Sequence, residues 1–145
     1  MNHPKYAAAD APIQEVLKQR FSAYSFTNQP VAGEDLAALF EAARWAASSY
    51  NEQPWRFLVA AKDTDPEGFA KLLSCLVEGN QAWAKFAPVL AIGVVMKNFT
   101  RNGKPNRAAE HDLGLATANL TFEATARGLN VHPMIGILSD RVREV

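Results

Sequence analysis

The 145-residue sequence contains one cysteine, three scattered histidines and no excess of either charge. Cys75 alone cannot form a disulfide within the chain, which suits a reducing cytosol and predicts a cytoplasmic protein. The histidines and the cysteine lack the spacing of metal ligands, so no metal site is expected. Fifteen basic residues balance fifteen acidic ones, and this balance predicts neither a nucleic-acid nor a membrane-surface partner.

Long apolar runs are also missing, so we expect a soluble protein without a transmembrane helix. The N-terminus lacks the apolar core of a signal peptide, because Asp10 interrupts its alanines. With 48% apolar and 21% charged residues, the composition is that of an ordinary globular protein. The length predicts a single domain over residues 1–145, with residues 1–11 as a loose arm or an early helix.

Apolar residues at helical spacing predict a helix ending near Arg20, and further helices over residues 34–47, around 69–76 and over 108–127. Continuous apolar runs at 56–61 and 88–95 predict two strands buried on both faces. Gly93, within the second run, permits close backbone approach. We expect a short third strand at 129–133 and a last helix beginning at Ser139.

The segment 97–107 has four basic residues and no acidic ones, and it is the candidate flexible region of the chain. Two interpretations stay open. It is either a solvated loop or a lid that attracts the phosphates of a nicotinamide cofactor.

The densest group of polar side chains lies in residues 47–57, A-S-S-Y-N-E-Q-P-W-R-F, between a predicted helix and a predicted strand. Two hydroxyls and two carboxamides fall within six residues, at Ser48, Ser49, Asn51 and Gln53. One interpretation is a helix exit stabilised by local side-chain bonds. The other is a ligand site, because an amide presents a donor and an acceptor side by side to the edge of a heteroaromatic ring.

This stretch resembles the S-S-x-N-x-Q-P-W-x-F signature of the nitroreductase family, the FMN-dependent NAD(P)H oxidoreductases. Three further segments are similar to the family and follow in its order. They are R-F-S at 20–22 with Phe26 behind it, E-G-N at 78–80 ahead of A-P-V at 87–89, and G-L-N-V-H-P-M-I-G at 128–136. Together these segments cover most of the chain.

The resemblance implies an α+β fold, a nitroreductase-like three-layer α/β/α sandwich with a central, mostly antiparallel sheet. It also implies a homodimer with FMN at the subunit interface, in which residues 48–53 serve the site across that interface. Full family members continue through at least one more strand and helix, which carry basic residues that grip the FMN phosphate. We therefore expect a chain truncated at its C-terminus, which ends at Val145.

The resemblance further implies which residues contact the cofactor. Tyr24 departs from the family, which often has Lys or Arg there, and so lacks a fixed positive charge. By position alone, Arg20 complements a helix dipole and Asn80 caps a helix. The implied cofactor-binding residues are Arg20, Ser22, Tyr24, Ser48, Ser49, Asn51, Gln53, Asn80, Pro133, Met134, Ile135 and Gly136.

The activity implied is ping-pong hydride transfer, in which NAD(P)H reduces FMN and a nitroaromatic, quinone or similar acceptor reoxidises it. The alternative is a truncated, non-catalytic relic that dimerises or binds flavin without turnover. No side chain is expected to act as an essential acid or base, because the cofactor carries the chemistry. His111 and Asp112 are adjacent and not expected to face each other. His132 is interpreted as structural or exposed, and Cys75 as a small core or surface residue rather than a nucleophile.

Overall fold

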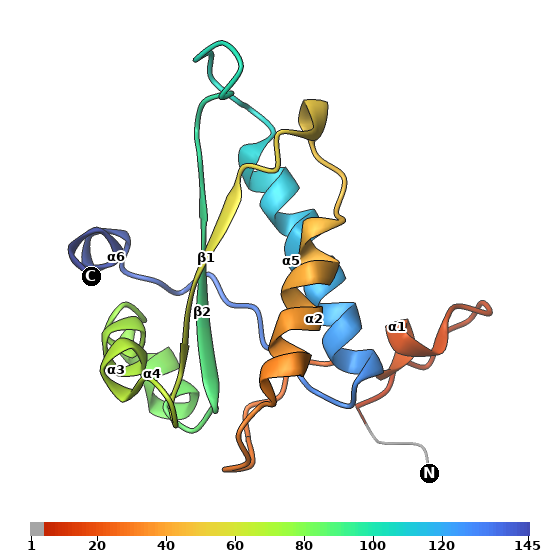
Figure 1. Cartoon of the computed structure of the whole chain (residues 1–145). Coiled ribbons are helices and arrows are strands. Elements are labelled where there is room, and N and C mark those ends of the chain that lie inside the picture. The colour runs from red at the N-terminus through yellow and green to blue at the C-terminus, as the bar shows by residue number, and fades with distance from the viewer. Residues whose placement is uncertain (1–4) are drawn as a thin grey trace.

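The computed structural model describes residues 5–145, which fold into three layers (Figure 1). The middle layer is an antiparallel pair of strands, β1 (Trp55–Ala61) and β2 (Val89–Val95). Helices α2 (Gly33–Arg44) and α5 (Ala109–Ala126) cover one face of this sheet, and α3 (Pro66–Ser74) and α4 (Glu78–Ala84) cover the other. This is the expected α+β sandwich, with a sheet of two strands within the described residues.

Shorter elements complete the chain. Helix α1 (Glu15–Gln19) precedes the sandwich, and α6 (Ser139–Glu144) lies on the α3 side of the sheet (Figure 1). The predicted loose arm falls partly on residues 1–4, which lie outside the described part of the chain. Its remainder forms no helix, although the Ala7 N–H donates to the Lys18 carbonyl at 2.9 Å and so docks on α1.

The sheet separates two apolar clusters, because successive side chains of a strand point to opposite faces. Ala60, Leu90 and Ile92 face the cluster built on α3 and α4, while Trp55 and Phe57 face the one built on α2 and α5. Gly93 lies opposite Phe57 on the α5 side. A Cβ at Gly93 would lie 3.0 Å from a Leu113 methyl, which confirms the predicted close approach.

Local sequence explains where several helices begin. Asp65 caps α3, since its carboxylate accepts from the Gly68 N–H at 2.9 Å, and Pro66 fits the first helical turn. Helix α5 buries Ala116, Leu120 and Ala124 along one stripe, as predicted. Its second apolar stripe, at Leu115, Phe122 and Ala126, stays exposed or half-buried in this chain.

Two elements differ from the sequence-based expectation. The helices expected from the sequence did not include residues 78–84, which form α4. The predicted third strand at 129–133 does not form. This segment borders a cavity of about 610 Å³ against β2 rather than pairing with that strand. Strand propensity alone therefore did not decide the pairing, which depends on tertiary contacts.

Residues 97–107 form a hairpin-shaped loop rather than an open one. Asn98 and Pro105 form an antiparallel bridge, and the Phe99 N–H donates to the Lys104 carbonyl at 2.8 Å. No helix among residues 5–145 is both long and apolar enough to cross a bilayer.

Candidate functional site

Residues 48–53, which we call the S-S-Y-N segment, leave α2 and enter β1 with an unusual backbone. Tyr50, Asn51 and Gln53 have φ of 55°, 55° and 49°, in the left-handed region that residues other than glycine rarely adopt. Each such residue costs about 1–3 kcal/mol and persists only when its surroundings hold it. Strain of this kind concentrates at binding sites, so the geometry adds to the signal of the polar side chains.

Two of the four polar side chains form hydrogen bonds within the segment or to the end of α2. The Ser48 hydroxyl accepts from the Gln53 N–H at 3.0 Å, and the Gln53 amide nitrogen donates to the Arg44 carbonyl at 3.0 Å. The helix-exit interpretation is therefore correct for these two side chains. Among residues 5–145, the Ser49 hydroxyl and the Asn51 amide form no hydrogen bond, and Asn51 is exposed. These two groups are the ones free to meet a ligand.

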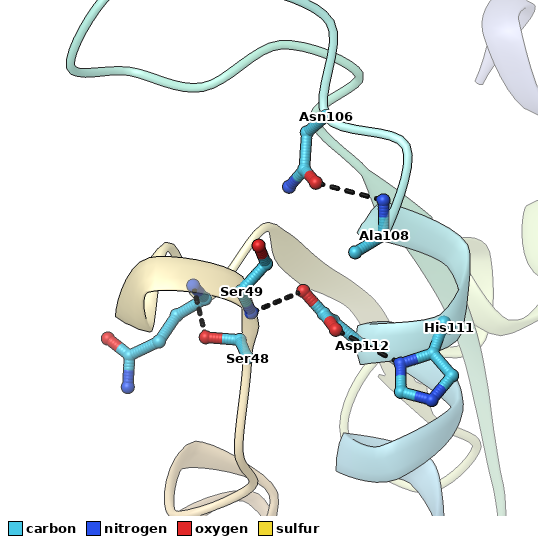
Figure 2. Close-up of polar contacts among 7 residues, drawn as sticks. Ser48, Ser49, Asn106, Ala108, His111 and Asp112 are labelled. Carbon is cyan, nitrogen blue, oxygen red and sulfur yellow. Dashed lines mark hydrogen bonds and ion pairs between the residues drawn. The ribbon is translucent and has the colours of Figure 1, made fainter.

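The first turn of α5 holds the segment from behind (Figure 2). A carboxylate oxygen of Asp112, a residue only 2% exposed, accepts from the Ser49 N–H at 3.0 Å. The other oxygen lies 3.2 Å from His111 Nδ1, so the prediction that these neighbours do not face each other was wrong. The side-chain torsions of His111 let its ring reach the Asp112 carboxylate, and the spacing of residues around a helix does not predict such torsions.

Sequence reasoning missed Asp112 as a site residue. Its signal was available, because Asp112 lies four residues before Ala116 and so on the buried stripe of the helix. A carboxylate on such a stripe needs hydrogen-bond donors, since burial of an unpaired charge is costly. The Ser49 N–H is one such donor.

A second buried polar residue, Asn106, lies above the same segment (Figure 2). Its side-chain oxygen accepts from the Ala108 N–H at 3.0 Å, just ahead of α5. Its amide nitrogen is buried and has no hydrogen-bond partner among residues 5–145. Most buried polar groups are paired, so an orphaned donor marks a place for a water or an acceptor atom.

The loop 97–107 is anchored to the S-S-Y-N segment from the outside. The Arg101 guanidinium stacks over the Tyr50 ring at 3.8 Å, and Phe99 meets the same ring edge-on at 5.8 Å. The Glu52 carboxylate accepts from the Thr100 N–H at 2.6 Å. This backbone hydrogen bond holds the pKa of Glu52 below its usual range. The loop is thus tied to the candidate site.

Several of the other predicted residues lie around α4. Trp83 of α4 meets Tyr24 edge-on at 4.9 Å and the His132 ring at 4.4 Å. The His132 Nδ1–H donates to the Ala23 carbonyl at 2.9 Å. These contacts agree with the structural interpretation of His132. They also bring three distant segments together, at residues 20–26, in α4 and at 132–136.

Asn80 and Gly136 form a direct pair in this second group. The Asn80 amide nitrogen donates to the Gly136 carbonyl at 3.2 Å, so Asn80 is not the helix cap that position alone predicted. A Cβ on Gly136 would lie 2.5 Å from that nitrogen. The missing side chain therefore makes room for Asn80.

The remaining predicted residues take no part in this hydrogen bond. Arg20 follows α1, half-buried, and its guanidinium forms no ion pair or hydrogen bond within residues 5–145. Ser22 is also half-buried and lies in the same stretch. In the segment 133–136, Pro133 is exposed, Met134 packs against the α3–α4 cluster, and Ile135 is 95% exposed.

The structure thus divides the predicted site into two groups within one chain. The S-S-Y-N segment bonds to the first turn of α5, whereas residues 132–136 come after that 18-residue helix and bond to α4. The 610 Å³ cavity is lined by Pro133 and Met134 but by none of the other ten predicted residues. It lies where the third strand was expected and is not the predicted site.

The fold and both groups of residues define a known class of protein. The family model of the nitroreductases matches residues 17–145, and the chain belongs to the nitroreductase family. This agrees with the resemblance seen in the sequence.

Individual relatives sharpen this placement. The chain is similar to a solved structure described as an oxidoreductase containing FMN, at 33% identity and a TM-score of 0.89, over 99% of this chain and 73% of that one. A nitroreductase family protein of Clostridium difficile superposes with a TM-score of 0.73 at 25% identity, over 89% of this chain and 71% of that one.

Curated sequences agree. The major NAD(P)H-flavin oxidoreductase of Aliivibrio fischeri is 41% identical over 92 residues, which cover 63% of this chain and 42% of that enzyme. A Stenotrophomonas maltophilia protein, provisionally named an NADH dehydrogenase/NAD(P)H nitroreductase, is 32% identical over 99% of this chain and 80% of its own length. The match to the Aliivibrio enzyme thus covers less than half of that protein.

Proposed function

We propose that this chain binds FMN and is an NAD(P)H-dependent oxidoreductase for nitroaromatics, quinones or similar acceptors. The observation that carries the proposal is the S-S-Y-N segment, where three left-handed residues present a free Asn51 amide and a free Ser49 hydroxyl. The names of the FMN-containing structural neighbour and the NAD(P)H-flavin oxidoreductase relative support it. When bound, FMN would supply hydride transfer between donor and acceptor, in the ping-pong order that the resemblance implies.

The donor groups available fit that cofactor. Arg20 carries a guanidinium without a partner among residues 5–145, and an arginine fork suits the two oxygens of a phosphate. Ser22 lies beside it in sequence. Ser49 and Asn51 offer a hydroxyl and an amide, which match the donors and acceptors on a flavin edge. The backbone of residues 133–136 would contact the other edge, and its N–H groups would stabilise negative charge there.

The positions of the two groups support a site shared between two copies of the chain. Within one chain the S-S-Y-N segment bonds to α5, while the second group is built on α4. A homodimer would bring the S-S-Y-N segment of one subunit close to Arg20 and to the second group of its partner. The exposed stripe of α5 at Leu115 and Ala126 is an apolar surface available for that contact.

The first test is the visible absorbance of the purified chain during titration with FMN, followed by addition of NADH or NADPH without oxygen. A bound flavin band that bleaches with either nucleotide is the expected result. No binding at saturating FMN would overturn the proposal and favour the non-catalytic relic.

A complementation experiment tests the shared site. In a mixed dimer of Arg20→Ala and Asn51→Ala chains, one site would carry both changes and the other neither. Random pairing should therefore restore about a quarter of the FMN sites. If both residues serve a site within one chain, the mixture should restore none.

A further inference from the structure

Asp112 is a buried carboxylate that no pattern in the sequence connected with the flavin site. It lies in the first turn of α5, 2% exposed, with one oxygen on the Ser49 N–H at 3.0 Å and the other on His111 Nδ1 at 3.2 Å. Its partner Ser49 is 63 residues away in the sequence. This long-range bond ties the S-S-Y-N segment to a long helix of the sandwich.

The bonded segment needs such an anchor. Residues 50, 51 and 53 all have positive φ, and a strained backbone relaxes unless its surroundings hold it. The other hydrogen bonds of the segment do not involve a buried acceptor on a long helix. The bond from the Gln53 N–H to Ser48 lies within the segment, and the bond to Thr100 comes from an exposed loop. Asp112 instead offers a buried acceptor on a helix packed against α2 and the sheet.

A second observation points to the same place. The Asn106 amide nitrogen is buried without a partner and lies on the Ser49 side of its own side chain (Figure 2). Its oxygen is already bonded to Ala108, which fixes the orientation of the amide. The start of α5 therefore presents an acceptor that is occupied by Ser49 and a donor that remains free, both toward the segment.

We propose that Asp112 is a positioning residue for the flavin site, which rests on the proposed function. Asp112 does not contact the cofactor. Its carboxylate holds the Ser49 N–H, and through it the segment, so that the Ser49 hydroxyl and the Asn51 amide project outward. The left-handed conformation at residues 50 and 51 is then present before FMN arrives, which lowers the ordering cost of binding.

The test compares three variants of the full chain. Asp112→Ala removes the acceptor, Asp112→Asn retains an oxygen that can accept from Ser49, and Thr121→Ala is the matched control. Thr121 is buried on the same helix and bonds only along it, to the Thr117 carbonyl at 2.7 Å. The measurements are the FMN dissociation constant from flavin fluorescence and the amide hydrogen exchange of residues 49–53 without FMN.

We expect Asp112→Ala to weaken FMN binding by about tenfold and to accelerate exchange at Ser49 and Asn51, because the segment loses its buried acceptor. Asp112→Asn should stay within about threefold of the unmodified chain, and Thr121→Ala within about twofold. If Asp112→Ala does not fold, Asp112→Leu removes the acceptor while filling the volume.

Two results would overturn the inference. One is slow exchange at residues 49–53 in the acceptor-less variants, matching Thr121→Ala, since the segment would then hold without Asp112. The other is equal loss of FMN affinity in Asp112→Asn and Asp112→Ala, since hydrogen bonding would then not be the cause. Absence of FMN binding by the unmodified chain would reject the proposed function alone, and the exchange measurement would still decide whether Asp112 holds the segment.

Discussion

The two halves of the candidate site are held by different kinds of interaction. The S-S-Y-N segment is exposed at Tyr50 and Asn51, has three left-handed residues and depends on polar anchors at Asp112 and Thr100. The group around α4 is held by contacts between the rings of Trp83, Tyr24 and His132. One hydrogen bond from the Asn80 amide to the Gly136 carbonyl adds to these contacts. Side-chain packing stabilises a site and backbone strain costs stability, so substitutions in the two halves should change the free energy of unfolding by different amounts.

The largest expected effect concerns one aromatic residue in each half. Trp83→Ala removes a half-buried ring from the α3–α4 cluster and should lower the free energy of unfolding by about 2–4 kcal/mol. Tyr50→Ala removes a ring that is 73% exposed and should change it by less than about 1 kcal/mol. Urea denaturation of both variants measures the difference, and equal losses would contradict the contrast.

Arg20→Ala should next affect cofactor binding rather than folding. Loss of a charged hydrogen-bond donor to phosphate should weaken FMN by about 1.5–3 kcal/mol, or roughly ten- to a hundredfold. Lys18→Ala is the control, because Lys18 pairs with Glu15 on the same helix at 3.5 Å. Fluorescence titration measures both affinities. Unchanged affinity in Arg20→Ala would remove Arg20 from the site.

Two glycines test how tightly the α4 half is packed. Gly136→Ala would place a Cβ 2.5 Å from the Asn80 amide nitrogen and 3.0 Å from a Val77 methyl. The clash should cost about 1–3 kcal/mol. Gly79→Ala, in α4 with nothing within 4 Å of the new Cβ, should be neutral or gain up to about 1 kcal/mol. Denaturation midpoints with unchanged slopes provide the comparison.

Asn51 separates strain from function in the first half. Asn51→Gly and Asn51→Ala both remove the free amide, so both should weaken FMN binding. Glycine adopts positive φ without penalty while alanine does not, so the glycine variant should be more stable by about 1 kcal/mol. Thermal unfolding measures the order. An alanine variant as stable as the glycine one would mean that the segment is not strained.

The smallest expected effect is a pH dependence in how Glu52 anchors the loop 97–107. The hydrogen bond from Thr100 lowers the pKa of Glu52, so its contribution to loop anchoring is present at neutral pH and is lost as the pH falls through the lowered value. The amide exchange protection factors of residues 99–101, which correct for the intrinsic pH dependence of exchange, should therefore be larger at pH 7 than at a pH below the lowered pKa of Glu52. In Glu52→Gln this pH dependence should disappear. If it persists, another group anchors the loop.

Much of the fold was predictable because local patterns and tertiary structure agree. The helical periodicity at 34–47 and 108–127 corresponds to α2 and α5, and the apolar runs at 56–61 and 88–95 correspond to β1 and β2. The expected burial on both faces was wrong for β1, in which Leu58 and Val59 are exposed. The predicted last helix forms as α6. Cys75 was expected to be a small core or surface residue, and the structure buries it in the core.

Other features were invisible locally. The run at 129–133 has strand character but pairs with no strand, since pairing requires a partner edge at the correct distance. Helix α4 begins at Glu78, in a stretch where the apolar spacing predicted no helix. Its Asn80 donates to Gly136, 56 residues away, which no local pattern indicates.

The sequence by itself determined the family and the order of most main elements, and it nominated the polar residues of the candidate site other than Asp112 and Asn106, because these follow from residue type, periodicity and motif spacing. Only the tertiary structure decided how those residues are held. It placed Asp112 beneath Ser49, Arg101 over Tyr50 and Trp83 against His132. These contacts join residues about 50 or more positions apart along the chain, and such pairs meet only when burial of the apolar clusters brings their helices and loops together.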